Sequence, residues 1–119
     1  MSLIPEELKR IMLENGRTNW ELSAKDQDTV DYKPVVKLFN PCGAATWLLT
    51  ELDPEDNDIA FGLCDLGMGS PELGPVRISE LEEYTGPLSI GIERDLHFDP
   101  DKTLSEYAEL ARIHQQIVT

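Results

Sequence analysis

The stretch PVVKLFNPCGAATWLLTELDPEDNDIAFGLC, residues 34–64, contains three short apolar runs separated by two groups of turn-forming residues. The runs occupy residues 35–39, 45–51 and 59–64. Their β-branched and aromatic residues are typical of strands, whereas the Asn-Pro-Cys-Gly segment 40–43 and the acidic segment 53–58 are typical of turns. Connections this short join antiparallel neighbours, so the stretch predicts three consecutive antiparallel strands.

Helices are predicted at both ends of the chain. Residues 4–16 place apolar side chains at helical spacing, with Pro5 in the first turn and Gly16 at the expected C-cap. Towards the other end, Thr103 and Glu106 form a capping box that opens an amphipathic helix reaching to the C-terminus. Each helix has one apolar flank, which predicts that both pack on the sheet.

The remaining segments complete the predicted fold. Residues 17–33 are polar and mixed, and we expect a surface connection there. Residues 76–78 predict a fourth strand, and the Ser-Glu-Leu-Glu segment 79–82 predicts a capping box with a brief helix. Residues 92–98 alternate like an edge strand. The chain, residues 1–119, is therefore predicted to be one α+β domain, a mainly antiparallel sheet of four to five strands with N-terminal and C-terminal helices packed on it.

The charge balance is the least ordinary feature of the composition. The chain has 23 acidic and 10 basic residues, which gives a formal net charge of −13. Neutralising phosphates requires clustered Lys and Arg, so we expect no binding to nucleic acid or to an anionic membrane. Three interpretations fit this charge: solubility, attraction to a basic protein partner, and mimicry of the phosphate backbone of DNA.

Targeting and cysteine signals favour the cytoplasm. No apolar run approaches the ~18–20 residues needed to cross a bilayer, and residues 1–10 contain Glu6 and Glu7 where a signal peptide has an apolar region. Cys42 and Cys64 lack the spacing of a zinc or redox motif. Both cysteines are therefore predicted to be reduced thiols in the core.

The best candidate for a metal site is the segment that contains Glu93, Asp95 and His97. These side chains would point the same way from an extended segment, and two carboxylates with an imidazole can bind a divalent cation. Three ligands on one strand lie in a row rather than around a point, so we favour ion pairs or solvent exposure and expect no cofactor. The acidic stretch 51–58 fails the EF-hand pattern, because Asp58 stands where that loop requires glycine.

Signals for nucleophilic or phosphate chemistry are weak. His97 and His114 are the chain's imidazoles, and no serine or cysteine lies in a nucleophile elbow. Gly62, Gly67 and Gly69 resemble a phosphate loop superficially, since no lysine follows them. A binding role is therefore favoured over an enzyme. The aromatic residues assigned to the core are Trp20, Phe39, Trp47, Phe61, Tyr84, Phe98 and Tyr107.

Five blocks of the sequence occur together in one known family. The blocks are residues 34–39, 47–54, 61–67, 71–74 and 93–98. In this order, and over roughly residues 4–115, the chain resembles the DUF2958 family, small bacterial domains of unknown function often found on plasmids and integrative conjugative elements. The resemblance implies a stand-alone domain in the company of mobile elements. It implies no activity, cofactor or catalytic residue.

Folding explains most residues of these blocks, and the polar remainder is the predicted site. The site candidates are Glu51, Asp65, Glu72, Glu93, Arg94, Asp95 and His97. We expect them to meet where the loop 65–75 approaches the segment 93–98.

The leading hypothesis for function is a non-enzymatic accessory protein of a mobile element that binds another protein through an acidic surface. A basic DNA-processing or defence protein would suit such a surface, and DNA mimicry is one concrete form of this hypothesis. The alternative is a metal-dependent hydrolase or nuclease that uses Glu93, Asp95 and His97 to hold a cation that activates water.

Overall fold

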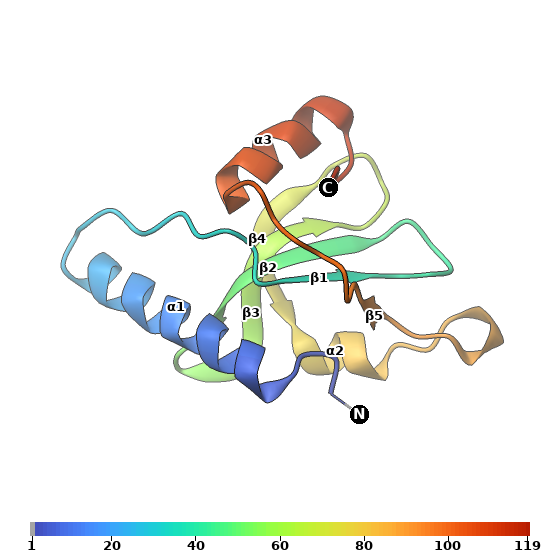
Figure 1. Cartoon of the computed structure of the whole chain (residues 1–119), viewed down its shortest axis with the longest axis horizontal. Helices are drawn as coiled ribbons and strands as arrows, with labels where there is room; N and C mark the ends of the chain where they lie inside the picture. Colours follow the sequence, from blue (N-terminus) through green and yellow to red (C-terminus); the bar gives the residue numbers. More distant parts are fainter. Residues whose placement is uncertain (1) are drawn as a thin grey trace.

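The computed structural model describes residues 2–119 and has a five-stranded antiparallel sheet in the order β4-β3-β2-β1-β5 (Figure 1). The strands are β1 (Val36–Phe39), β2 (Thr46–Asp53), β3 (Asp56–Asp65), β4 (Glu72–Arg77) and β5 (Glu93–Arg94). The helices are α1 (Glu6–Ala24), α2 (Ile78–Glu83), the 3-10 helix η1 (Pro87–Ser89) and α3 (Leu104–His114). The predicted α+β fold with helices at both ends is confirmed.

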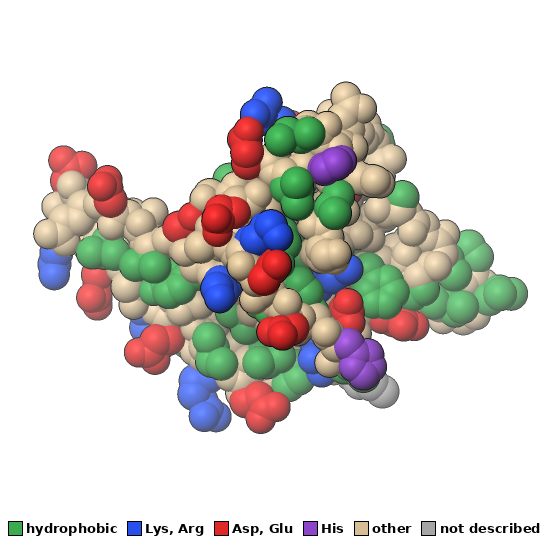
Figure 2. Space-filling view, turned by 45° about the horizontal axis from the view of Figure 1, so that its top comes forward, with side chains coloured by type: hydrophobic (Ala, Val, Ile, Leu, Met, Phe, Trp, Pro, Cys, Tyr) green, Lys and Arg blue, Asp and Glu red, His purple; other side chains and the backbone are tan. Residues whose placement is uncertain are grey.

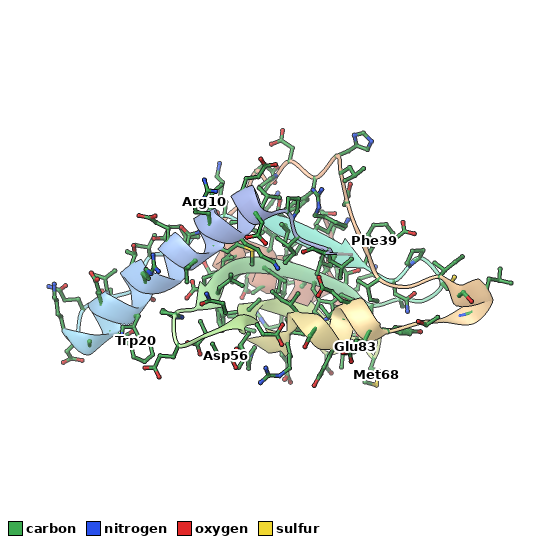
Figure 3. The ribbon with its side chains drawn as sticks, turned by 90° about the horizontal axis from the view of Figure 1, so that it is seen from below. Arg10, Trp20, Phe39, Asp56, Met68 and Glu83 are labelled. Carbon is green, nitrogen blue, oxygen red and sulfur yellow. The ribbon has the colours of Figure 1, made fainter. Side chains whose placement is uncertain are left out.

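Helices cover both faces of the sheet. Trp47 and Leu49 of β2 point into a core shared with α1 and α2, whereas Leu48 between them points into a second core shared with α3. Side chains alternate along a strand, so these two cores lie on opposite faces of one sheet. Figure 3, seen from below, shows α1 and α2 in front of the strands.

A β-bulge at Thr50 sets the direction of the side chains that follow it. Leu49 pairs with Gly62 and Glu51 pairs with Phe61, so Thr50 is an extra residue in β2. Without the bulge, Glu51 would share the face of Leu49 and enter the α1 core. With the bulge, Glu51 lies on the same face as its partner Phe61.

Helix α1 lies along an edge of β2 that no strand covers. Val36 of β1 pairs with Leu49, so the following residues of β2 have no strand partner on that side. The Asn15 side chain donates a hydrogen bond to the Thr50 carbonyl oxygen at 3.0 Å. Gly16 comes so close that a Cβ atom there would lie 1.8 Å from the carbonyl oxygen of Leu52.

The prediction that the first helix ends at Gly16 is wrong. Helix α1 continues to Ala24, so residues 17–24 are helical rather than part of a surface connection. Gly16 is buried in the middle of the helix, where its missing side chain allows the close approach to Leu52. The glycine therefore serves packing rather than capping.

Two capping predictions had different outcomes. The capping box of Thr103 and Glu106 is confirmed at the start of α3. The box predicted at Ser79 is wrong, because α2 begins at Ile78 and the Ser79 amide and hydroxyl donate to the carboxylate of Asp58 at 3.0 and 2.6 Å. The side chain of Asp58 on β3, rather than a residue of the local sequence, therefore accepts the backbone amide in the first turn of α2.

The bounds of two strands also differ from the predicted ones. Strand β4 begins at Glu72 and ends before residue 78, and the predicted edge strand 92–98 is reduced to Glu93 and Arg94. Both cysteines are free, but Cys42 is exposed rather than in the core. Among the predicted core aromatics, Trp20, Phe61 and Tyr84 are exposed. No helix within residues 2–119 is long and apolar enough to cross a membrane.

Candidate functional site

A large surface cavity lies between the C-terminal half of α1, the segment 25–35 that follows it, strands β2 and β3, and the start of α3. We call it the first cavity, and its volume is about 880 Å³, which falls in the range of ligand sites. Its principal lining side chains are Asn19, Trp20, Asp31, Tyr32, Thr50, Glu51, Asp53, Phe61, Leu73, Pro75 and Ser105.

The lining of the first cavity combines carboxylates with aromatic rings. Its acids are Asp31, Glu51 and Asp53, and its aromatic residues are Trp20, Tyr32 and Phe61. No Lys, Arg or His is among the lining residues. None of the three acids takes part in an ion pair within residues 2–119. The cavity is therefore electronegative and has apolar walls.

Glu51 is a half-buried acid of the first cavity. Its Oε2 atom accepts hydrogen bonds from Asn19 Nδ2 at 3.0 Å and from Thr50 Oγ1 at 3.5 Å. The hydrogen bonds found within residues 2–119 leave its Oε1 atom for another donor. The bulge at Thr50 places Glu51 here, because it turns the side chain out of the α1 core.

Asn19 of α1 hydrogen-bonds to two other walls of the first cavity. It is 8% exposed, and its side chain pairs with the backbone of Val30 through Val30 N to Oδ1 at 2.8 Å and Nδ2 to Val30 O at 3.2 Å. The same Nδ2 group donates to Glu51. One amide side chain therefore fixes both the acid and the segment 25–35 relative to α1.

The opposite rim is tied to α3. The carboxylate of Asp31 accepts hydrogen bonds from the Ser105 amide, at 3.1 Å, and from the Ser105 hydroxyl. The Leu104 amide donates to the Tyr32 carbonyl oxygen at 2.8 Å. Residues 30–32 of the segment are therefore fixed to α1 on one side and to α3 on the other, which gives the cavity a defined wall without regular secondary structure.

Burial raises the pKa of Glu51, and the hydrogen bonds from Asn19 and Thr50 oppose that rise in part. A carboxyl group with a raised pKa binds more protons in the folded state than in the unfolded state. Stability is therefore lost as the pH rises from the unfolded pKa through the folded pKa, and the loss is complete above the folded pKa.

Replacing Glu51 with glutamine is expected to raise the midpoint of thermal unfolding at neutral pH. Glutamine keeps the shape and an acceptor oxygen but brings no charge into the half-buried position. The difference from the wild type should vanish below about pH 4, where the carboxyl group is protonated in both states. Glu83→Gln, an exposed change at the end of α2, should leave the midpoint unchanged. An unchanged or lower midpoint for Glu51→Gln at neutral pH would show that Glu51 is not desolvated.

Another surface cavity, which we call the second cavity, brings together four of the predicted site residues. It has a volume of about 590 Å³ and lies between the β1–β2 turn and β5. The predicted residues that line it are Glu93, Arg94, Asp95 and His97. Lys37 of β1 also lines it and pairs with Asp95 at 3.8 Å.

The second cavity does not gather its acids and imidazole around a metal. Within residues 2–119, no three Asp, Glu, His or Cys side chains are arranged to hold a metal ion. Asp95 is already engaged, because its Oδ1 accepts the His97 amide at 2.9 Å and its Oδ2 faces Lys37. The geometry therefore lends no support to the metal-dependent alternative.

Asp65 and Glu72 line neither cavity. Asp65 is 3% exposed, and its carboxylate accepts the amides of Gly67 at 2.8 Å and Ile117 at 2.9 Å. It therefore ties the C-terminal segment to the end of β3. Strands β1 and β2 separate β3 from β5 in the sheet. The predicted site residues therefore lie in separate parts of the molecule and do not form one site.

On the face of the molecule that carries α3, the acidic side chains do not form one continuous patch (Figure 2). Figure 2 shows Asp and Glu side chains interspersed there with Lys, Arg and apolar groups. Local ion pairs, such as Lys102 with Asp101 and Arg112 with Glu109, contribute to this mixture. The first cavity is distinguished from such a surface by acids that have no cation beside them.

Sequence reasoning identified Glu51 but missed most of the first cavity. Trp20 and Phe61 were assigned to the core, yet they are 51% and 38% exposed. Asn19 and Asp31 lay in a segment interpreted as a plain connection. The available signal was the helical spacing of Met12, Gly16 and Asn19, the three residues that α1 buries.

The comparisons with known proteins give a family and no activity. A family model described as "Protein of unknown function (DUF2958)" matches residues 3–118. No curated protein and no solved structure matches the chain. The match confirms the resemblance seen in the sequence, and the function has to be argued from the geometry of the cavities.

Proposed function

Because the chain belongs to the DUF2958 family of proteins of unknown function, we propose its role from its geometry: it is a protein-binding module that holds a basic segment of a partner in the first cavity. The observation that carries this proposal is that one cavity combines aromatic walls with a half-buried acid, Glu51, that has no ion-pair partner among residues 2–119. No step of bond making or breaking is part of the proposal.

Charge supports a cationic partner. The chain carries a net charge of −13, and this long-range field attracts basic proteins and repels nucleic acid. Inside the first cavity, hydrogen bonds compensate the burial of Glu51 only in part, and no Lys, Arg or His of the described residues lines the cavity. A partner's ammonium or guanidinium group would supply the missing charge and a donor for Oε1.

Shape supports a segment of protein rather than a small ion. A volume of about 880 Å³ exceeds the space that a single side chain needs. Trp20, Phe61 and Leu73 present apolar surface that can cover the hydrocarbon stems of Lys and Arg side chains. Figure 3 shows Trp20 near the C-terminal end of α1, on the side of the β2–β3 turn.

Calorimetric titration with a blocked peptide of alternating glycine and basic residues, half Arg and half Lys, tests this proposal. We expect binding at low salt that weakens as salt rises, because the attraction is between charges. Glu51→Gln should lower the affinity by about tenfold, the worth of one charge-assisted hydrogen bond.

Glu83→Gln is the matched control, because it removes the same charge from an exposed site. Figure 3 shows Glu83 on α2, well separated from Trp20 at the C-terminal end of α1. Equal losses of affinity in the two variants would show that the peptide senses net charge and not the cavity. An absence of binding at low salt would overturn the proposal itself.

A further inference from the structure

We infer that the first cavity selects arginine over lysine, with one guanidinium group bound at Glu51 against the ring of Trp20. This inference rests on the proposed function and adds the identity of the recognised side chain. The cavity contains a half-buried acid, exposed aromatic side chains and carboxylate oxygens that accept no hydrogen bond from residues 2–119.

Desolvation favours a guanidinium group beside Glu51. The acid is half-buried, so a cation that pairs with it has to lose much of its own water. A guanidinium group is more weakly hydrated than an ammonium group, and it stays charged when it is buried. Arginine therefore loses less hydration free energy than lysine on entering this cavity.

The aromatic wall also favours arginine. Trp20 is 51% exposed, although it is a large apolar side chain on a helix that packs on the sheet. Phe61 of β3, which has Pro75 of β4 as its cross-strand partner, lines the same cavity. A planar guanidinium group can stack on an indole face, whereas an ammonium group meets it as a point charge.

The open acceptors match a donor with several N–H groups. Among residues 2–119, no donor binds Oε1 of Glu51, and the one hydrogen bond to the Asp53 carboxylate, from the Glu55 amide at 2.8 Å, is to Oδ1. Both acids line the same cavity. Arginine presents five N–H donors in a fixed plane, so one side chain can donate to Glu51 while its face contacts Trp20.

Two blocked peptides of equal length and charge test the inference, one with arginine and one with lysine at every basic position. We expect the arginine peptide to bind the wild-type protein about tenfold more tightly. Trp20→Leu, which keeps an apolar side chain but removes the ring, should bring the ratio of the two affinities close to one. Trp20→Phe should preserve a ratio well above one.

The outcomes separate this inference from the function on which it rests. Equal binding of both peptides, weakened alike by Glu51→Gln, would overturn arginine selectivity and leave the cationic site standing. An arginine preference that survives Trp20→Leu would overturn the stacking geometry. If neither peptide binds, the proposed function fails together with the inference. Trp20 is exposed, so its replacement is not expected to unfold the protein.

Discussion

Gly16→Ala is expected to destabilise the protein by about 3 kcal/mol, although alanine is the better helix former by about 1 kcal/mol. The added Cβ would lie 1.8 Å from the Leu52 carbonyl oxygen and 3.0 Å from its carbonyl carbon. Both atoms belong to the backbone, so relief requires α1 to move off β2. Urea unfolding followed by tryptophan fluorescence measures the loss as a lower midpoint.

Gly74→Ala is the control for this prediction. Gly74 lies on β4, and a Cβ added there meets nothing within 4 Å, so its replacement should change the free energy of unfolding little. Gly16→Ala with the stability of the wild type would contradict the packing of α1 along the open edge of β2. That packing also positions Asn19 and Trp20, so the variant should lose peptide binding as well.

Asp65→Ala is expected to cost about 3 kcal/mol, because it removes a buried acceptor of two backbone amides. Gly67 and Ile117 would lose their partner at the end of β3, and the C-terminal segment would be released there. Hydrogen exchange at the Ile117 amide measures the release directly.

Asp99→Ala, a change of the same size at an exposed position, should be close to neutral. Peptide binding provides the second comparison, since Asp65 does not line the first cavity. Asp65→Ala should therefore bind the basic peptide normally at temperatures where it is folded. Normal stability together with lost binding would instead place Asp65 in the binding site.

The parts of the fold that could be predicted are those set by neighbours in the sequence. Alternation and turn residues located β1, β2 and β3, and a capping box located the start of α3 at Thr103. The parts that failed depend on contacts distant in sequence. Gly16 has the pattern of a C-cap until Leu52 is known to touch it, and Ser79 has the pattern of a capping residue until Asp58 is known to reach it.

The candidate site was harder to predict than the fold for the same reason. Glu51 was named because it is an acid within a familiar block, but its direction depends on the bulge at Thr50. Trp20 has the appearance of a core residue in a sequence and is exposed in the structure. The shared cavity of Trp20 and Glu51 depends on how α1 packs against β2, and no spacing along the chain encodes it.

The central claim is that a cationic segment binds between Trp20 and Glu51, and the chain's two tryptophans test it directly. Trp20 is 51% exposed in the first cavity, whereas Trp47 is 6% exposed in the core below α1. In a proton–nitrogen NMR titration with the arginine peptide, the account predicts a shift of the Trp20 indole signal, a stationary Trp47 signal and a much weaker response in Glu51→Gln. A stationary Trp20 signal, or equal movement of both indole signals, would contradict it.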